Sequence, residues 1–330
     1  MILRKVFSLF RDYYPRLIAA YVFRRRSHLS FWHDTPSINP DATFNALGPY
    51  YMVFGAKADY PGPFDAEGVP ILQYHGSVGR QYNPIAIAQY GLGNYNQYCR
   101  SKDADRLRRF LQAANWLVLH LERNALGLSV WNHYFDWHYR VPLKSPWYSG
   151  LAQGQGLSVL VRAYKETGEE KYASAVQDAF RSFEKPLKEG GVVCQDLSGD
   201  VWIEEYIVDP PTHILNGFIW AIWGIWDYWL GTREMYAQEL FNETISTLER
   251  NLERYDTGFW SLYERPERGD RMLASFFYHR LHIIQLDVLF QMTGRKVFGE
   301  YSERWREYER NFLNRMRAGV LKAFFKITRY

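Results

Sequence analysis

Two adjacent glutamates near the middle of the chain are the first residues whose types and spacing can do acid–base chemistry. The sequence WIEEY (202–206) places Glu204, Glu205 and Tyr206 on a short extended or looped segment before a long aromatic stretch. Because successive residues of an extended segment point to opposite sides, Glu205 can face a cleft while Glu204 faces its wall or solvent. A carboxyl group at the mouth of an aromatic cleft is partly desolvated, which raises its pKa toward the value that suits a general base. A solvated acidic turn explains the same residues equally well.

A second group of polar residues lies on a predicted helix, in the sequence YHRLHIIQL (278–286). Tyr278, His282 and Gln285 stand at i, i+4 and i+7, so one helix face carries a phenol, an imidazole and an amide. Buried polar groups need hydrogen-bond partners, so such a face is either an internal network or a wall that binds a ligand. We favour the binding wall, and His279 is a further candidate for substrate binding.

A predicted turn and strand supply aromatic candidates for sugar contacts. The sequence YDTGFWSLY (255–263) indicates a turn followed by an alternating, strand-like segment. Tyr263 and Trp260 are its ring-bearing candidates. A hairpin packed for structural reasons explains Trp260 at least as well.

The sequence YSGLAQGQG (148–156) contains several glycines but is a poor phosphate-binding loop. It does not follow a strand, and the Lys-Ser/Thr pair that ends such a loop is missing. We expect its glycines to let two helices approach closely, while Gln153 and Gln155 can reach a substrate.

The sequence shows no metal-binding or cofactor motif. The nine histidines are scattered, the pair His279 and His282 lacks a third ligand nearby, and no HExxH or calcium-loop spacing occurs. Cys99 and Cys194 are too few for a disulfide framework or a Cys-rich zinc site. No nucleophile-elbow sequence supports a Ser-His-Asp triad. We therefore expect neither a metal nor a cofactor.

The composition is rich in aromatic residues, which make up 18% of the 330 residues. Such rings fill a helical core, and they also line carbohydrate clefts, where they stack on the C–H faces of sugars. The formal net charge of +4 favours a polyanionic partner. Nucleic acid, a membrane surface and an acidic glycan are all such partners, and the charge alone does not choose among them. Because no nucleic-acid-binding signature occurs, we do not favour nucleic acid.

The elements that must position these candidates are helices, whose patterns recur in pairs after Asn83. Residues 1–82 are punctuated by prolines and predict loops with a few short strands. Residues 83–330 predict the catalytic domain, mainly α, as an incomplete α/α toroid of about four helical hairpins. The helices are expected at 84–98, 104–122, 148–166, 170–184, 211–230, 233–254, 272–293 and 297–315.

No segment predicts a signal peptide or a membrane-spanning helix. The basic N-terminus (1–26) has a short apolar run, but arginines follow where a cleavage site should be. The Trp-rich run from His213 to Leu230 is interrupted by Asn216 and Asp227, so we interpret it as a buried core helix. A peripheral membrane contact through the N-terminus and a homodimer remain open, and a cytoplasmic or peripheral membrane location is favoured.

Five motifs in consistent order resemble the C-terminal helical domain of the D-glucuronyl C5-epimerases, which act on heparan sulfate and heparosan. The resemblance spans about residues 83–310. The motifs are YSGLAQGQGLSVLVRAY (148–164), WIEEY (202–206), ILNGF (214–218), YDTG with the downstream Tyr263, and YHRLHIIQL (278–286).

The resemblance implies an isomerase that converts D-glucuronate to L-iduronate in a heparosan-like acidic polysaccharide. Glu205 is the implied base that removes the C5 proton, and Tyr278 is the implied donor on the opposite face. Tyr206 and Tyr263 are implied to act in hydrogen bonding or proton relay. The substrate-binding candidates are Asn216, His279, His282, Gln285, Gln153, Gln155 and one arginine after Tyr263, of which Arg265 is the first.

The chain departs from the family pattern in two respects. It is expected to lack the additional β-rich domain of the animal enzymes, and Arg265, Arg268 and Arg271 compete for the position of the active-site arginine. A polysaccharide lyase or uronyl hydrolase on a helical toroid is the alternative, because a lyase shares the abstraction of the C5 proton. A non-catalytic glycan-binding protein is the third interpretation.

Overall fold

The computed structural model describes residues 15, 17–24, 34–74, 76–265 and 271–329. These residues divide into two compact units. Unit 2 consists of the described residues of Ile38–Arg250, and unit 1 consists of those of Met1–Ser37, Asn251–Arg265 and Gly269–Tyr330. The predicted domain boundary between residues 82 and 83 falls inside unit 2 and stays a prediction.

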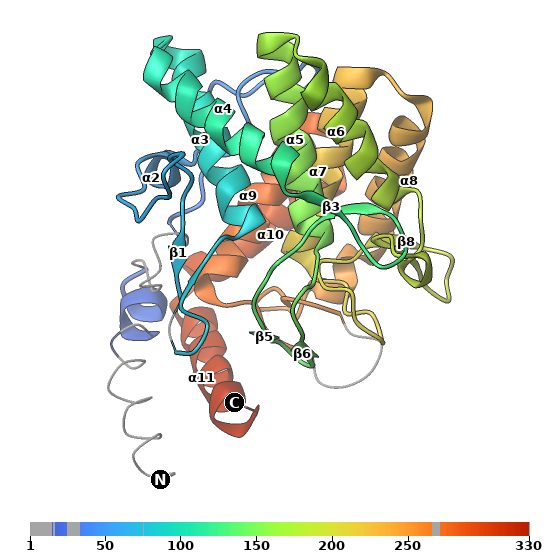
Figure 1. The fold of residues 1–330 in the computed structure, drawn as a ribbon. Coiled ribbons are helices and arrows are strands. Elements are labelled where there is room, and N and C mark those ends of the chain that lie inside the picture. The colour runs from blue at the N-terminus through green and yellow to red at the C-terminus, as the bar shows by residue number, and fades with distance from the viewer. Residues whose placement is uncertain (1–14, 16, 25–33, 75, 266–270, 330) are drawn as a thin grey trace. The chain divides into compact units, whose positions relative to one another are not determined.

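The described residues of unit 2 form three helical hairpins (Figure 1). The hairpins are α3 (Pro84–Ser101) with α4 (Ala104–Leu119), α5 (Gly150–Thr167) with α6 (Glu170–Phe180), and α7 (Leu215–Thr232) with α8 (Met235–Asn251). Helices α3, α5 and α7 pack side by side, while α4 packs on α3 and α6 packs on α5. This two-layer order is that of an α/α toroid. The predicted mainly α class built from helical hairpins is confirmed.

Short antiparallel hairpins occupy the connections of unit 2. The paired strands are β1 (Leu72–Gln73) with β2 (Arg80–Gln81), β3 (Leu121–Arg123) with β4 (Ser129–Trp131), β5 (Trp137–His138) with β6 (Pro142–Leu143), and β7 (Val193–Gln195) with β8 (Val201–Ile203). The part before α3 contains only β1, β2 and the short helix α2 (Gly55–Ala58) among its described elements of unit 2. It is irregular, as predicted.

Local sequence signals set the ends of the helices. The Asn83 side chain accepts hydrogen bonds from the amides of Ile85 and Ala86 at 2.9 and 3.2 Å. Pro84 fills the first position of α3, where its missing N–H costs nothing. Gly168 ends α5 with a φ of 69°, a conformation that glycine adopts without strain.

Glycines let α5 and α7 approach closely, as the sequence predicts. A Cβ atom added to Gly224 would lie 2.1 Å from the carbonyl oxygen of Gly154. One added to Gly154 would lie 2.6 Å from Cα of Ala221. Only glycine fits at such contacts between backbones. The close approach joins the two helices whose first turns hold the segment with Glu204 and Glu205.

A fully buried ion pair also links α5 to α7. Arg162 donates to both carboxylate oxygens of Asp227, at 2.6 and 3.0 Å. The Tyr51 hydroxyl donates to Oδ1 of Asp227 at 2.6 Å, and Arg162 donates to the Gly48 carbonyl at 2.9 Å. Neither charged side chain has exposed surface. Such a pair stabilises a fold only while both charges are present, because each alone is costly to bury.

We expect Asp227→Asn to lower the free energy of unfolding by about 3–5 kcal/mol, because Arg162 would stay buried without its counter-charge. Asp41 is the matched control, since its ion pair with Arg100 is largely exposed. Asp41→Asn should cost less than about 1 kcal/mol. Urea unfolding followed by circular dichroism measures both, and equal losses would contradict the role given to Asp227.

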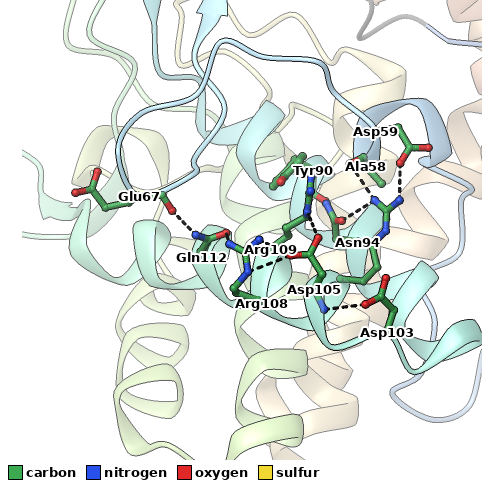
Figure 2. Close-up of polar contacts among 11 residues, drawn as sticks. Ala58, Asp59, Glu67, Tyr90, Asn94, Asp103, Asp105, Arg108, Arg109 and Gln112 are labelled. Atoms are coloured by element: carbon green, nitrogen blue, oxygen red, sulfur yellow. Dashed lines mark hydrogen bonds and ion pairs between the residues drawn. The ribbon is translucent and has the colours of Figure 1, made fainter.

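The arginines at the start of α4 make polar contacts within this helix and with its neighbours, and Figure 2 shows those of Arg108 and Arg109 with Asp105. Arg106 donates to Asn94 of α3 at 3.1 Å and to Asp59, just after α2, at 2.8 Å. Arg109 donates to Asp105 at 2.7 Å within α4. These guanidinium charges are therefore paired with carboxylates at the surface of unit 2.

The described residues of unit 1 contain the α-helices α9 (Phe276–Thr293), α10 (Lys296–Arg310) and α11 (Phe312–Arg329). Helices α9 and α10 form a hairpin, and α11 packs on the short helix η1 (Ile18–Val22). The eight predicted helices are all observed, with ends displaced by at most five residues. Helix α11 is an addition that the sequence pattern did not predict.

No helix in the described part of the chain is long and apolar enough to cross a membrane. The run from His213 to Leu230 is largely the buried helix α7, as predicted. Most of the basic N-terminal segment, for which the sequence leaves a peripheral membrane contact open, lies outside the described residues.

Candidate functional site

Glu205 lies between the end of β8 and the start of α7, and only 5% of its surface is exposed. Its carboxyl group packs on Gly217 in the first turn of α7, where an added Cβ atom would lie 2.2 Å from Oε2. Nδ2 of Asn216 donates to the same oxygen at 3.4 Å. Because Glu204 is also fully buried, the interpretation of these glutamates as a solvated acidic turn is wrong.

The pKa of Glu205 is raised to about 8, mainly because burial disfavours the charged form. Hydrogen bonds from Tyr206 and Asn216 oppose the rise, and the negative charge of Glu204 adds to it. A carboxylate with a raised pKa holds a proton more strongly than an exposed one. Glu205 is therefore suited to taking a proton from a weakly acidic carbon.

Glu204 points away from Glu205, as an extended segment requires. Its Oε2 accepts hydrogen bonds from the backbone amides of Thr212 and His213 at 3.2 and 3.1 Å. Its Oε1 lies 2.6 Å from Nδ1 of His213. Glu204 thus faces the wall and binds the residues that lead into α7.

Tyr206 lies among aromatic rings, which supports the expected aromatic surroundings of the site. Its ring centroid is 4.7 Å from that of Tyr139 and 5.7 Å from that of Trp147. Hydrogen bonding from Tyr206 lowers the pKa of Glu205. Tyr206 and Glu205 therefore act on each other directly.

The two glutamines of α5 are buried and serve different neighbours. Oε1 of Gln153 accepts from the Trp131 amide at 2.9 Å, and its Nε2 donates to Oγ of Ser182 at 3.0 Å. Gln155 accepts from Nε2 of Gln89 at 3.1 Å. The polar atoms of Gln153 are thus used by the fold, so this side chain is not a substrate ligand in the proposed reaction.

In unit 1, the rings of Tyr263 and Tyr278 lie against each other, with centroids 4.8 Å apart and planes inclined by 58°. The backbone amide of Tyr263 donates to Met272 at 2.8 Å, and Oγ of Ser275 accepts from the amide of Tyr278 at 3.3 Å. A strand-like segment and the first turn of α9 therefore bring the two predicted tyrosines together.

His279 belongs to an internal hydrogen-bond network. Its Nδ1 accepts from the backbone amide of Ser261 at 3.2 Å, so Nε2 carries the proton and donates to the Trp305 carbonyl at 3.0 Å. Oγ of Ser261 lies 2.8 Å from Nδ1 of His279 and 3.0 Å from Nδ1 of His282. Because both nitrogens of His279 serve the fold, the geometry supports the internal-network alternative for this residue.

Burial keeps both histidines neutral, because it lowers the pKa of His279 to about 4 and that of His282 well below its ordinary value. Nε2 of His282 is buried and has no hydrogen-bond partner in the described part of the chain. Substrate binding by His282 therefore stays a prediction. No group of three His, Cys, Asp or Glu side chains that could hold a metal occurs among the described residues.

Two predicted residues of unit 1, Arg265 and Gln285, remain, and a buried glutamate that the sequence analysis did not predict precedes Arg265 in the sequence. Arg265 donates to Oδ1 of Asn251 at 2.7 Å, and Gln285 is buried on α9. Glu264, beside Tyr263, is buried, which raises its pKa to about 8 against the lowering effect of Lys322. Its neighbours in sequence carry no pattern that predicts its burial. Arg268, a competitor of Arg265, lies outside the described residues.

Glu205 should make stability depend on pH. Its pKa is higher in the native chain than the ordinary value of 4.5, so the native state keeps this proton while the unfolded chain loses it. Stability should therefore fall as pH rises from about 4.5 to about 8, by several kcal/mol in all, since each pKa unit is worth about 1.4 kcal/mol.

We expect Glu205→Gln to remove this penalty, so the variant should gain stability over the wild type as pH rises through that window. Urea unfolding at about pH 5, 7 and 9 measures the difference. Glu303→Gln is the control, because hydrogen bonding to Arg306 lowers the pKa of Glu303 below this window. A difference between wild type and Glu205→Gln that does not change with pH would contradict the raised pKa.

Comparison with known families identifies the part of the chain that carries these residues. Residues 126–307, more than half of the chain, match the family model described as "D-glucuronyl C5-epimerase C-terminus". The chain belongs to this family. The matched region of this C5-epimerase family member includes Glu205, Tyr206, Tyr263 and Tyr278.

Two relatives and one solved structure are similar to this C5-epimerase family member. An uncharacterized protein of Methanocaldococcus jannaschii is 27% identical over 269 residues, which cover 75% of this chain and 86% of that protein. The D-glucuronyl C5-epimerase of Caenorhabditis elegans is 30% identical over 216 residues, 60% of this chain and 34% of that enzyme. The chain thus spans about a third of the nematode protein. The unsaturated glucuronyl hydrolase of Bacillus sp. GL1 aligns with a TM-score of 0.46 at 16% identity, over 68% of this chain and 61% of that structure.

Each unit brings part of the predicted site together. In unit 2, Glu205 lies with Tyr206 and Asn216, and in unit 1, Tyr263 lies with Tyr278. The sequence analysis did not predict that the Glu205 carboxyl group packs on Gly217. The glycine of ILNGF was the available signal, because glycine inside a helix often marks a close approach.

Proposed function

We propose that this chain inverts C5 of D-glucuronate units in a heparosan-like acidic polysaccharide and produces L-iduronate. The observation that carries the proposal is Glu205, a buried carboxyl group whose pKa is raised to about 8, within the region that matches the C5-epimerase family. The nematode relative is named a D-glucuronyl C5-epimerase, which supports the same reaction class.

The proposed reaction begins with Glu205 as the base. The C5 proton of glucuronate lies next to a carboxylate, so its removal creates an enolate-like dianion that needs nearby hydrogen-bond donors or cations. Glu205 in its ionised form accepts the proton, and its raised pKa makes this transfer less unfavourable. Tyr206, which already hydrogen-bonds Glu205, is the proposed relay residue on this side.

Inversion requires that a proton reach C5 from the opposite face. We assign this role to Tyr278, whose phenol is a hydrogen-bond donor and acid. The ring of Tyr263 lies against that of Tyr278, with centroids 4.8 Å apart, which supports a role for Tyr263 in orienting the donor. Asn216, His282, Gln285, Gln155 and Arg265 are the proposed substrate-binding residues, and Arg265 supplies a positive charge suited to a uronate carboxylate.

Incubation of heparosan with the protein in deuterated water tests this proposal. The expected result is deuterium at C5 together with new L-iduronate, measured by proton NMR, and no change in chain length. Unsaturated uronate ends with ultraviolet absorbance would instead establish a lyase. Glycan binding without any exchange would leave a binding protein and overturn the proposed reaction.

A further inference from the structure

The backbone and side chain of Glu204 join three parts of unit 2. Its amide donates to the Val192 carbonyl at 2.9 Å, which ties it to the residue before β7. Its carbonyl accepts from the amide of Gly150, the first residue of α5, at 3.0 Å. An added Cβ atom on Gly150 would lie 2.4 Å from this carbonyl oxygen, so the contact requires glycine. The position of the backbone next to Glu205 is therefore fixed by its neighbours.

The Glu204 carboxylate closes the loop that runs from β8 to α7. It binds the amides of Thr212 and His213 with one oxygen and the His213 ring with the other, at 2.6 Å. Both Glu204 and His213 are fully buried. Two residues later α7 begins, and its first turn carries Asn216 and Gly217, which contact Glu205. The Glu204 carboxylate thus links the backbone next to Glu205 to the first turn of α7, on which the Glu205 carboxyl group packs.

His213 is held in an uncommon backbone conformation. Its φ is +48°, in the left-handed region that few residues other than glycine adopt, although His, Asn and Asp occur there more often than the rest. Its ring stacks on Trp202, with centroids 4.4 Å apart. A strained residue persists only where the surrounding structure determines it, and such residues cluster at functional sites. The bond to Glu204 and the stack on Trp202 are the interactions that determine it here.

We infer that Glu204 and His213 form a positioning pair that sets the placement of the Glu205 carboxyl group on the first turn of α7 for proton abstraction. This inference rests on the proposed function. Neither residue touches the substrate in this scheme. The pair acts through Glu205, because a small displacement of a reacting group costs a large part of the rate.

The negative charge of Glu204 has a second effect on the same carboxyl group. It raises the pKa of Glu205, whereas Tyr206 lowers it, and α7 contributes the uncharged amide of Asn216. These are the groups that act on Glu205 among the described residues. Removing the charge of Glu204 while keeping its shape should therefore lower the pKa of Glu205.

Two pairs of variants separate positioning from simple structural support. His213→Asn keeps a residue that tolerates positive φ and offers Nδ2 as a donor where Nδ1 of His213 stood, whereas His213→Ala offers neither. Glu204→Gln keeps the carbonyl oxygen that accepts from Thr212 and His213 but removes the charge. Asp200→Asn is the control, because Asp200 precedes the same strand and pairs with Arg250 instead.

The test measures kcat and KM for C5 deuterium exchange in heparosan, and it follows the Glu205 carboxyl carbon by 13C NMR as pH is changed. We expect His213→Ala to lower kcat about a hundredfold with KM nearly unchanged, and His213→Asn to recover most of the loss. Glu204→Gln should lower the pKa of Glu205 and move the rising limb of the pH profile to lower pH. Asp200→Asn should leave kcat, the pKa of Glu205 and the pH profile as they are in the wild type.

Two results would overturn the inference. One is a folded His213→Asn as impaired as His213→Ala, and the other is a folded Glu204→Gln with the wild-type pKa at Glu205 and the wild-type pH profile. The absence of exchange in the wild type would refute the proposed reaction instead. The NMR titration still tests the effect of Glu204 on Glu205 in that case, so the two failures are distinguishable.

Discussion

Glu205→Gln should slow the abstraction of the C5 proton from glucuronate about 10²- to 10⁴-fold, the range that a positioned general base contributes. Glutamine has nearly the same shape as glutamate. It can therefore keep the contacts that the Glu205 carboxyl group makes with Asn216 and Gly217. It cannot accept a proton from carbon. The loss should therefore appear in kcat while the variant remains folded.

The pH dependence of the wild-type rate gives the same prediction a second readout. The base is active only when ionised, so the rate should rise with pH until about pH 8, the pKa of the buried carboxyl. Glu205→Gln should lose this rising limb, and the surface variant Glu303→Gln should keep it. A wild-type rate that is flat between about pH 5 and 9 would contradict Glu205 as the base.

Tyr278→Phe should reduce the formation of L-iduronate by about 10²- to 10⁴-fold, because it removes the phenolic proton that the proposed reaction returns to C5. Phenylalanine keeps the ring that packs against Tyr263, with the ring centroids 4.8 Å apart in the wild type. Glu205 would still remove and return the C5 proton on its own face. We therefore expect deuterium to enter glucuronate at C5 with little inversion.

Separate measurements of exchange and inversion by NMR identify this signature. Tyr164→Phe is a matched control, because Tyr164 lies on α5 with 39% of its surface exposed. It should leave both rates near those of the wild type. If Tyr278→Phe formed L-iduronate as fast as the wild type, Tyr278 would not be the opposing donor.

The helices were predictable because their end signals are local. Asn83 with Pro84 starts α3, and Gly168 ends α5, where each residue acts on amides or carbonyls within one turn. The glycine at 154 similarly indicated close helix packing, which its contact with Gly224 confirms, whereas Gly156 packs against the ring of Trp131. Helix α11 was missed because the predicted eighth helix was continued to residue 315, past the end of α10 at Arg310.

The candidate site was predictable in its residues but not in their partners. The alternation of an extended segment indicated that Glu204 and Glu205 point to opposite sides, and the structure shows this arrangement. Glu204 and His213, which share a hydrogen bond, are nine positions apart in the sequence, and no periodic pattern indicates their contact. His279 was assigned to substrate because its partners Ser261 and Trp305 come from segments 18 and 26 residues away.

The proposed reaction removes a proton on one face of C5 and returns a proton on the other. A single turnover of heparosan in deuterated water, followed by isolation of the iduronate units, tests it most directly. We predict one deuterium at C5 of each new L-iduronate, because the returning proton comes from a group in exchange with solvent. New L-iduronate that retains the original hydrogen at C5 would contradict a mechanism with two separate groups, and the absence of L-iduronate would contradict the epimerase.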